Sequence, residues 1–180
     1  MKTKMVFTVL AASLVFLPAA CYAASPSETV TVKITSAEGK DVGTVTLTEK
    51  KGGVAFKMDL MNLPPGEHAV HIHKNPKCEP PDYASSGPHF NPTGKEHGIH
   101  NPNGFHAGDI PLNLKVSGDG TEKSSFVVKT ISLDPTAENS ILANGGTSIV
   151  IHAGPDDMET DPGGESGRRI ACGVIAPPGS

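Results

Sequence analysis

The stretches TVTVKITS (29–36), GTVTLTEK (43–50) and GVAFKMDL (53–60) decide the fold class. In each of them apolar and polar residues alternate with a period of two, the pattern of a β-strand with one buried and one solvated face. Turns that contain glycine, such as KGG (51–53), separate the stretches. The three stretches therefore predict consecutive antiparallel strands.

Five further segments predict strands of the same kind. They are HAVHIH (68–73), LNLKVS (112–117), SSFVVKT (124–130), TSIVIHA (147–153) and IACGVIA (170–176). No segment has convincing helical periodicity, so the chain is expected to be all-β. Eight short strands favour a β-sandwich or a β-barrel.

Two long connections, residues 74–111 and 154–169, interrupt the regular spacing of the strands. Both are dense in proline, glycine and polar residues. Loops of that length inside a compact domain are usually functional or disordered. The first loop carries four histidines, so we expect a ligand to order it.

The N-terminus predicts a secretory signal peptide at residues 1–23, followed by a single mature domain at 24–180. Lys2 and Lys4 precede an apolar run that ends in small residues, and the run is shorter than the ~20 residues of a membrane span. Cleavage is expected after Ala23, because Pro18 stands where a lipoprotein signal usually has leucine. Membrane attachment is expected only if Cys21 is lipidated, and the predicted location is the periplasm or another extracytoplasmic compartment.

Charge and cysteine content narrow the functional classes further. The chain has 15 basic and 19 acidic residues, and loss of the two leader lysines leaves 13 against 19, a formal charge of −6. No basic patch indicates a nucleic-acid partner. Cys78 and Cys172 remain in a chain bound for an oxidising compartment, which predicts a disulfide between them. Such a bridge contributes at most about 4 to 5 kcal/mol in the chain-entropy model.

The histidines are unevenly distributed, because seven of the eight lie between residues 68 and 106. His71 and His73 share one face of a predicted strand, about 6.6 Å apart at ~3.3 Å per residue, so both rings can reach one ion. His68 and His100 are expected to be solvated residues without a role.

A second set lies in the first long loop and contributes three imidazoles and one carboxylate, from His89, His97, His106 and Asp109. Nitrogen and oxygen donors of this kind suit tetrahedral zinc. The set contains no cysteine, which distinguishes it from a zinc finger.

Six strings in this chain resemble the copper,zinc superoxide dismutases in order and spacing, and the stretch bearing "GEHAVHIH" resembles the bacterial secreted type. The strings are HIH (71–73), GPHFNP (87–92), HG (97–98), HAGD (106–109), VIHAGPDD (150–157) and GRRIACGVI (167–175). The resemblance implies an eight-stranded Greek-key β-barrel, an immunoglobulin-like sandwich with two long functional loops.

The resemblance also implies the ligands of one copper and one zinc ion per chain. Copper would be bound by His71, His73, His89 and His152, and zinc by His89, His97, His106 and Asp109. Seven ligands for eight coordination positions require one shared ligand, and the resemblance assigns that role to His89.

Three further roles follow from the resemblance. Asp156 would hydrogen-bond one copper ligand and one zinc ligand, His71 and His97. Arg169 would dock the anionic substrate, with Arg168 left as a surface charge. The family's intrasubunit disulfide would be Cys78 to Cys172.

The implied activity is dismutation of superoxide to dioxygen and hydrogen peroxide, with redox chemistry at copper, proton transfer at His89 and a structural zinc. It would protect the cell envelope from extracytoplasmic superoxide. The loop at 154–169 departs from the expected pattern, since it holds five acidic residues and no lysine. Lys74, Lys77 and Lys95, on the other long loop, are the remaining candidates for attracting the anion.

Three other functions are compatible with a β-domain rich in histidine. A copper carrier of the same fold would add cysteine-based copper motifs, a copper-only dismutase would lack the zinc ligands, and an adhesive sandwich would not need so complete a ligand set. The sequence contains no CxxC or CxC and fills every ligand position. Monomer and homodimer both remain open.

Overall fold

The computed structural model describes residues 29–177 and 179, so the predicted signal peptide and Cys21 lie outside the described residues. Two short 3₁₀ turns, η1 (Ala84–Ser86) and η2 (Ala143–Gly145), accompany the strands. The strands are β1 (Thr29–Ser36), β2 (Asp41–Lys50), β3 (Gly53–Leu60), β4 (Gly66–His73), β5 (Asp109–Val116), β6 (Glu122–Val128), β7 (Thr147–His152) and β8 (Arg169–Ile175).

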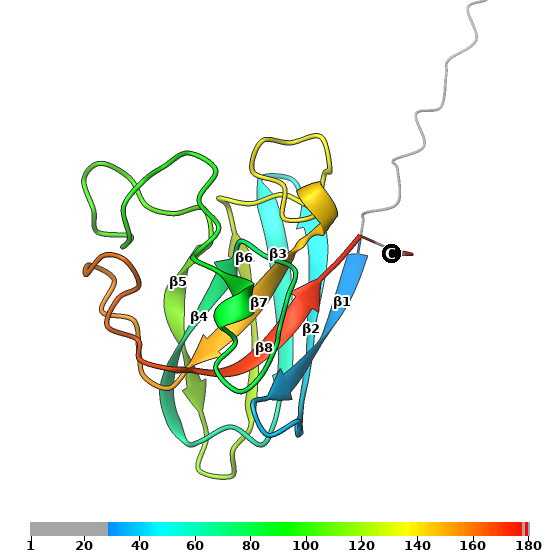
Figure 1. Ribbon diagram of the computed structural model, residues 1–180, viewed down its shortest axis with the longest axis vertical. Coiled ribbons are helices and arrows are strands. Elements are labelled where there is room, and N and C mark those ends of the chain that lie inside the picture. The colour runs from blue at the N-terminus through cyan, green and yellow to red at the C-terminus, as the bar shows by residue number, and fades with distance from the viewer. Residues whose placement is uncertain (1–28, 178, 180) are drawn as a thin grey trace, which may run out of the picture.

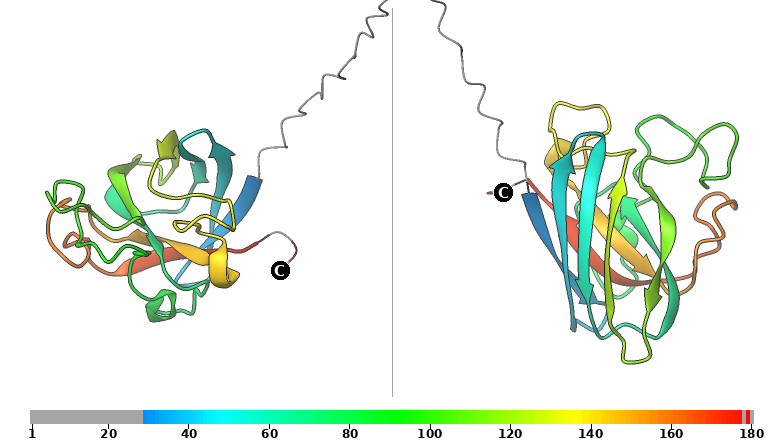
Figure 2. Two further views of the ribbon diagram at one scale, coloured as in Figure 1. Left: turned by 90° about the horizontal axis from the view of Figure 1, so that it is seen from above. Right: turned by 180° about the vertical axis from the view of Figure 1, so that it is seen from behind.

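The strands form one antiparallel sheet in the order β5-β4-β7-β8-β1-β2-β3-β6, curled into a nearly closed barrel (Figures 1 and 2). The two edge strands, β5 and β6, are joined by a tight turn at residues 117–121. The connections from β3 to β4 and from β6 to β7 join strands that are not neighbours, as a Greek key requires. The predicted all-β, eight-stranded barrel is confirmed.

Alternation along the first strands builds the core. On β1 the side chains of Val32 and Ile34 are fully buried, while Thr31 and Lys33 between them are exposed. Phe56 of β3, also fully buried, stacks on Phe126 of β6 with ring centroids 5.3 Å apart. Because of the period of two in the sequence, alternate side chains of these strands lie on an inner apolar face and an outer polar face.

The strands β4 and β7 are buried on both faces. Val70 and Ile72 of β4 belong to the apolar core, and His71 and His73 point to the outer face, yet these two histidines are only 0% and 1% exposed. The long loops at 74–108 and 153–168 lie over this side of the barrel (Figure 1). The loops thus create a second buried region outside the core.

Two long connections were expected from the sequence, and the structure has a third at residues 129–146. Its Ile131, Leu133 and Ile141 are fully buried in the core cluster. This loop was not predicted, because its apolar residues follow no regular period. Within the described residues, no helix has the length and apolarity needed to cross a membrane.

Candidate metal centre

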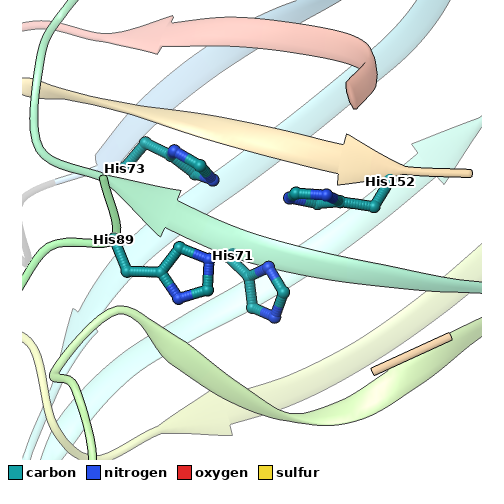
Figure 3. Close-up of side chains that lie close together, drawn as sticks. All are labelled: His71, His73, His89 and His152. Carbon is teal, nitrogen blue, oxygen red and sulfur yellow. The ribbon is translucent and has the colours of Figure 1, made fainter. Parts of the chain in front are cut away.

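The predicted ligands come from separate parts of the chain and meet on the outer face of the barrel. His71 and His73 lie on β4, His152 ends β7, and His89 lies in the loop at 74–108. Figure 3 shows these four rings turned toward one another. Alternation on β4 explains why His71 and His73 share the outer face, with ring centroids 6.5 Å apart.

These four histidines form the first candidate metal site. Their donor atoms lie within 4.8 Å of one another, and all four side chains are buried. The ring centroids of His71 and His89 are 4.1 Å apart, and those of His73 and His152 are 5.6 Å apart. Four imidazoles at such distances form an all-nitrogen donor set that suits copper.

The hydrogen bonds of the rings support this assignment. In each of His71, His73 and His152, one ring nitrogen contacts an acceptor: Asp156 Oδ2 at 2.8 Å, Gly87 O at 2.8 Å and Gly167 O at 3.1 Å. The opposite nitrogens, His71 Nδ1, His73 Nε2 and His152 Nε2, are buried and have no hydrogen-bond partner among the described residues. A proton on the bonded nitrogen leaves a lone pair on the other, directed at a shared point.

A second candidate site lies next to the first and is built around the Asp109 carboxylate. Its Oδ1 lies 2.8 Å from His89 Nδ1, 3.1 Å from His97 Nδ1 and 3.2 Å from His106 Nδ1. The backbone N–H groups of Gly98 and His106 donate to its other oxygen, Oδ2. Three imidazole nitrogens and one carboxylate oxygen are a tetrahedral donor set that suits zinc.

Burial and hydrogen bonds shift the pKa values of groups within the cluster. Burial by itself raises the pKa of Asp109, but hydrogen bonds from His106, His89 and His97 outweigh it and hold this pKa well below its usual range. Burial is the main cause that lowers the pKa of His89 to about 4 and that of His152 to about 3. Both rings are therefore neutral at pH 7, the form in which imidazole binds a metal.

His89 belongs to both candidate sites. Its Nδ1 faces Asp109 at 2.8 Å, which leaves Nε2 for the first site. Its ring centroid lies 4.1 Å from that of His71 and 5.4 Å from that of His106. One imidazole thus stands between the two donor sets.

Asp156 also connects the two sites, from outside the donor sets. Its Oδ2 lies 2.8 Å from His71 Nε2, and its Oδ1 lies 3.0 Å from His97 Nε2. The carboxylate is buried, and hydrogen bonds from these two rings counteract the effect of burial and lower its pKa. One aspartate therefore orients a ring in each site.

Arg169, the first residue of β8, lies at the rim of the first site. Its Nη1 donates to Tyr83 O at 2.7 Å and to Ser86 Oγ at 2.9 Å, and its Nη2 donates to Gly87 O at 2.9 Å. These bonds hold the guanidinium in one orientation on the loop at 74–108. Arg168, by contrast, is exposed.

The predicted disulfide is confirmed, since Cys78 and Cys172 are bonded with a Cα–Cα distance of 5.7 Å. The bond ties the loop at 74–108 to β8. Because Cys172 is three residues from Arg169, the bond joins the loop to the strand that carries the guanidinium.

A cavity of about 1340 Å³ opens over the first site. Arg169, Lys74 and Lys95 are the cationic side chains that line it; Lys77 does not. Its acidic lining residues are Glu96, Glu138, Asp161 and Glu165. Cations therefore reach the cavity from β8 and from the loop at 74–108, whereas acids reach it from all three long loops.

The interpretation of His68 as a solvated residue is wrong. It is 3% exposed, and its ring nitrogens lie 2.8 Å from His152 O and 2.8 Å from Pro64 O. His68 shares a strand face with Val70, so the period of two indicated its burial; its contact with His152 could not be foreseen. His100 is exposed, as expected.

The fold and these sites define a class: β-barrel proteins that carry two adjacent metal sites on the outside of the barrel. The family model described as "Copper/zinc superoxide dismutase (SODC)" matches residues 42–175. The chain therefore belongs to the copper/zinc superoxide dismutase family.

Relatives and solved structures agree with the family. A superoxide dismutase [Cu-Zn] of Aquifex aeolicus is 43% identical over 143 residues, covering 79% of this chain and 84% of the relative. One from Caulobacter vibrioides is 40% identical over 147 residues, covering 81% and 84%.

Among solved structures, a double mutant of a SOD-like protein from Bacillus subtilis has a TM-score of 0.79 at 38% identity, covering 82% of this chain and 97% of that one. The Cu/Zn superoxide dismutase of Brucella abortus has a TM-score of 0.66 at 32% identity, covering 82% and 99%. Because a SOD-like protein and a Cu/Zn superoxide dismutase both share this fold, the donor sets of this chain carry the functional argument.

Proposed function

We propose that this chain converts superoxide to dioxygen and hydrogen peroxide. Copper would be held by His71, His73, His89 and His152, and zinc by His89, His97, His106 and Asp109. The observation that supports this most directly is the convergence of His71 Nδ1, His73 Nε2 and His152 Nε2, three buried ring nitrogens that no described group satisfies.

Copper would supply one-electron redox chemistry, and the chain's own residues would do the rest. His89 would serve both sites, with Nδ1 on the side of Asp109 and Nε2 on the side of the first site, and Nε2 could hold a proton only in place of the metal. Zinc has no redox chemistry. The zinc ligands would therefore fix the loop at 74–108 and hold His89 in place.

Arg169 would bind the anion at the copper site. Its guanidinium already has three fixed acceptors on the loop and still lines the cavity beside His73 and His152. A fixed cation that lines a cavity raises the local concentration of a small anion despite a net negative protein.

We propose further that residues 1–23 direct export and that residues 24–180 form the mature domain, in the periplasm or an equivalent compartment. There it would protect the cell envelope from superoxide. The disulfide between Cys78 and Cys172 supports an oxidising location. Lipid attachment at Cys21 is the less favoured form, and the mature protein would be a monomer or a homodimer.

The test is superoxide dismutation by the purified mature protein, with copper and zinc measured by elemental analysis. Rapid dismutation with about one copper and one zinc per chain, lost on copper removal, is expected from the two donor sets. Full metal loading without dismutation would contradict the proposal and indicate a copper carrier.

A further inference from the structure

Asn113 of β5 makes two hydrogen bonds to the backbone of a single residue, Asp156. Its Nδ2 donates to Asp156 O at 3.0 Å, and its Oδ1 accepts from Asp156 N at 2.8 Å. An amide side chain that pairs with both backbone groups of one residue fixes that residue's position and orientation together. Asp156 is the residue whose carboxylate contacts His71 and His97.

An irregularity in the sheet explains why Asn113 can reach this loop. The β4–β5 ladder pairs Ala69 with Asn113 but His71 with Asp109, so β5 has two more residues than β4 over this interval. The backbone N–H of Ala69 donates to Gly154 O at 2.8 Å. Two cross-strand partners, Ala69 and Asn113, thus hold the loop at 154 and again at 156.

We propose that Asn113 is a positioning residue for both metal sites. Its amide holds the Asp156 backbone where the two carboxylate oxygens meet His71 Nε2 and His97 Nε2. These contacts orient the rings so that each directs Nδ1 into its own site. This inference rests on the proposed function, since it assumes that the two sites hold metals.

The hydrogen bonds of Asn113 indicate that its side chain positions Asp156 rather than stabilising β5 itself. Within the described residues, both hydrogen bonds of its side chain go to Asp156. The side chain is half-buried on the outer face, while its neighbour Leu114 faces the core and is 1% exposed. Loss of the amide therefore removes support from Asp156 and leaves the core intact.

The expected effect is on metal retention. Partners that orient metal ligands typically change metal affinity by about 10- to 100-fold when mutated. Asn113 acts one step further out, through Asp156, so we expect a change of about tenfold. It should be larger for zinc, because the zinc ligand His97 lies in a loop, whereas the copper ligand His71 lies in a strand.

The test compares Asn113→Ala and Asn113→Leu with the wild type, all loaded with copper and zinc. Leucine restores most of the side-chain volume, so an effect common to both variants reports lost hydrogen bonds. Asn139→Ala is the matched control, because Asn139 Nδ2 also donates to a backbone carbonyl, Thr130 O, at 2.9 Å. The rate of zinc release into excess chelator is measured, together with the melting temperature of each metal-free protein.

Both Asn113 variants should release zinc about tenfold faster than the wild type, and Asn139→Ala should match the wild type. Cobalt(II) placed in the zinc site should show altered visible bands in the Asn113 variants only, because the geometry of His97 changes. Wild-type rates in both Asn113 variants, or equal acceleration in Asn139→Ala, would overturn the inference.

The experiments distinguish failure of the proposed function from failure of the positioning role of Asn113. A wild-type protein that loads both metals without dismutating superoxide would overturn the function, while faster zinc release from the Asn113 variants would still support the positioning role. A wild type that takes up no zinc would overturn both.

Discussion

The two halves of the barrel use the same strand pattern for different purposes. In the open half, strands β1, β2, β3 and β6, residues alternate between a buried inner face and a largely solvated outer face. In the covered half, strands β4, β5, β7 and β8 with the loops at 74–108 and 153–168, much of the outer face is buried as well. That second buried layer holds the histidines.

This difference separates stability from function. The open half buries apolar side chains, and the free energy gained by their burial does not depend on a metal. The covered half buries imidazoles and carboxylates, which are costly to bury unless hydrogen bonds or metal ions satisfy them. Substitutions in the two halves should therefore have effects of different kinds.

The largest effect is expected from His89→Ala, which removes the one side chain common to both candidate sites. Affinity for copper and for zinc should both fall by more than about 100-fold, beyond the effect of losing an orienting partner. Elemental analysis and dismutation assays would measure it, with exposed His100→Ala as the control. Normal copper and zinc occupancy in His89→Ala would show that His89 is not shared.

A core substitution in the open half should lower the stability of the fold and leave the metal content unchanged. Leu47→Ala truncates a fully buried side chain of β2 and should lower the free energy of unfolding by about 2 to 5 kcal/mol. Because the cavity it leaves is inside the barrel, metal content at room temperature should stay normal. Denaturant unfolding and elemental analysis would measure both quantities, and loss of metal at native temperatures would show that the halves are coupled.

Arg169→Glu tests the covered half without removing a ligand. It reverses the fixed charge beside the first site, and kcat/KM for superoxide should fall by roughly 10- to 100-fold, which lies within the range of about 10- to 1000-fold for electrostatic focusing. Arg168→Glu makes the same charge change on an exposed neighbour and should have little effect. If Arg169→Glu retains full activity with normal metal content, the guanidinium has no role in binding the anion.

Much of the open half was predictable because one physical rule, the period of two, acts along each strand. The segments at 29–36 and 53–60 match β1 and β3 to the residue, and the others are displaced by one to three residues. The rule weakens at strand ends, where β5 already begins at Asp109 inside a stretch interpreted as loop.

The covered half was less predictable from physics alone. His71 and His73 could be placed on one face, but the folding of the loop that brings His89 beside them follows no period. Without the family resemblance, Asp156 would have been interpreted as a solvated acid. Asn113 was missed because its contact with Asp156 depends on the irregular pairing of β4 with β5. No sequence pattern predicts that irregularity.

The smallest effect is expected at the rim of the cavity. Lys74 and Lys95 line it and Lys77 does not, although all three are exposed on the same loop. Exposed charges act through solvent and are screened over about 10 Å at 0.1 M salt. Lys74→Ser with Lys95→Ser should lower kcat/KM about two- to threefold at low ionic strength and scarcely at high ionic strength, whereas Lys77→Ser should change little at either. If Lys77→Ser lowers kcat/KM as much as Lys74→Ser or Lys95→Ser does alone, net charge rather than position attracts the anion, and the cavity lining has no special part in steering.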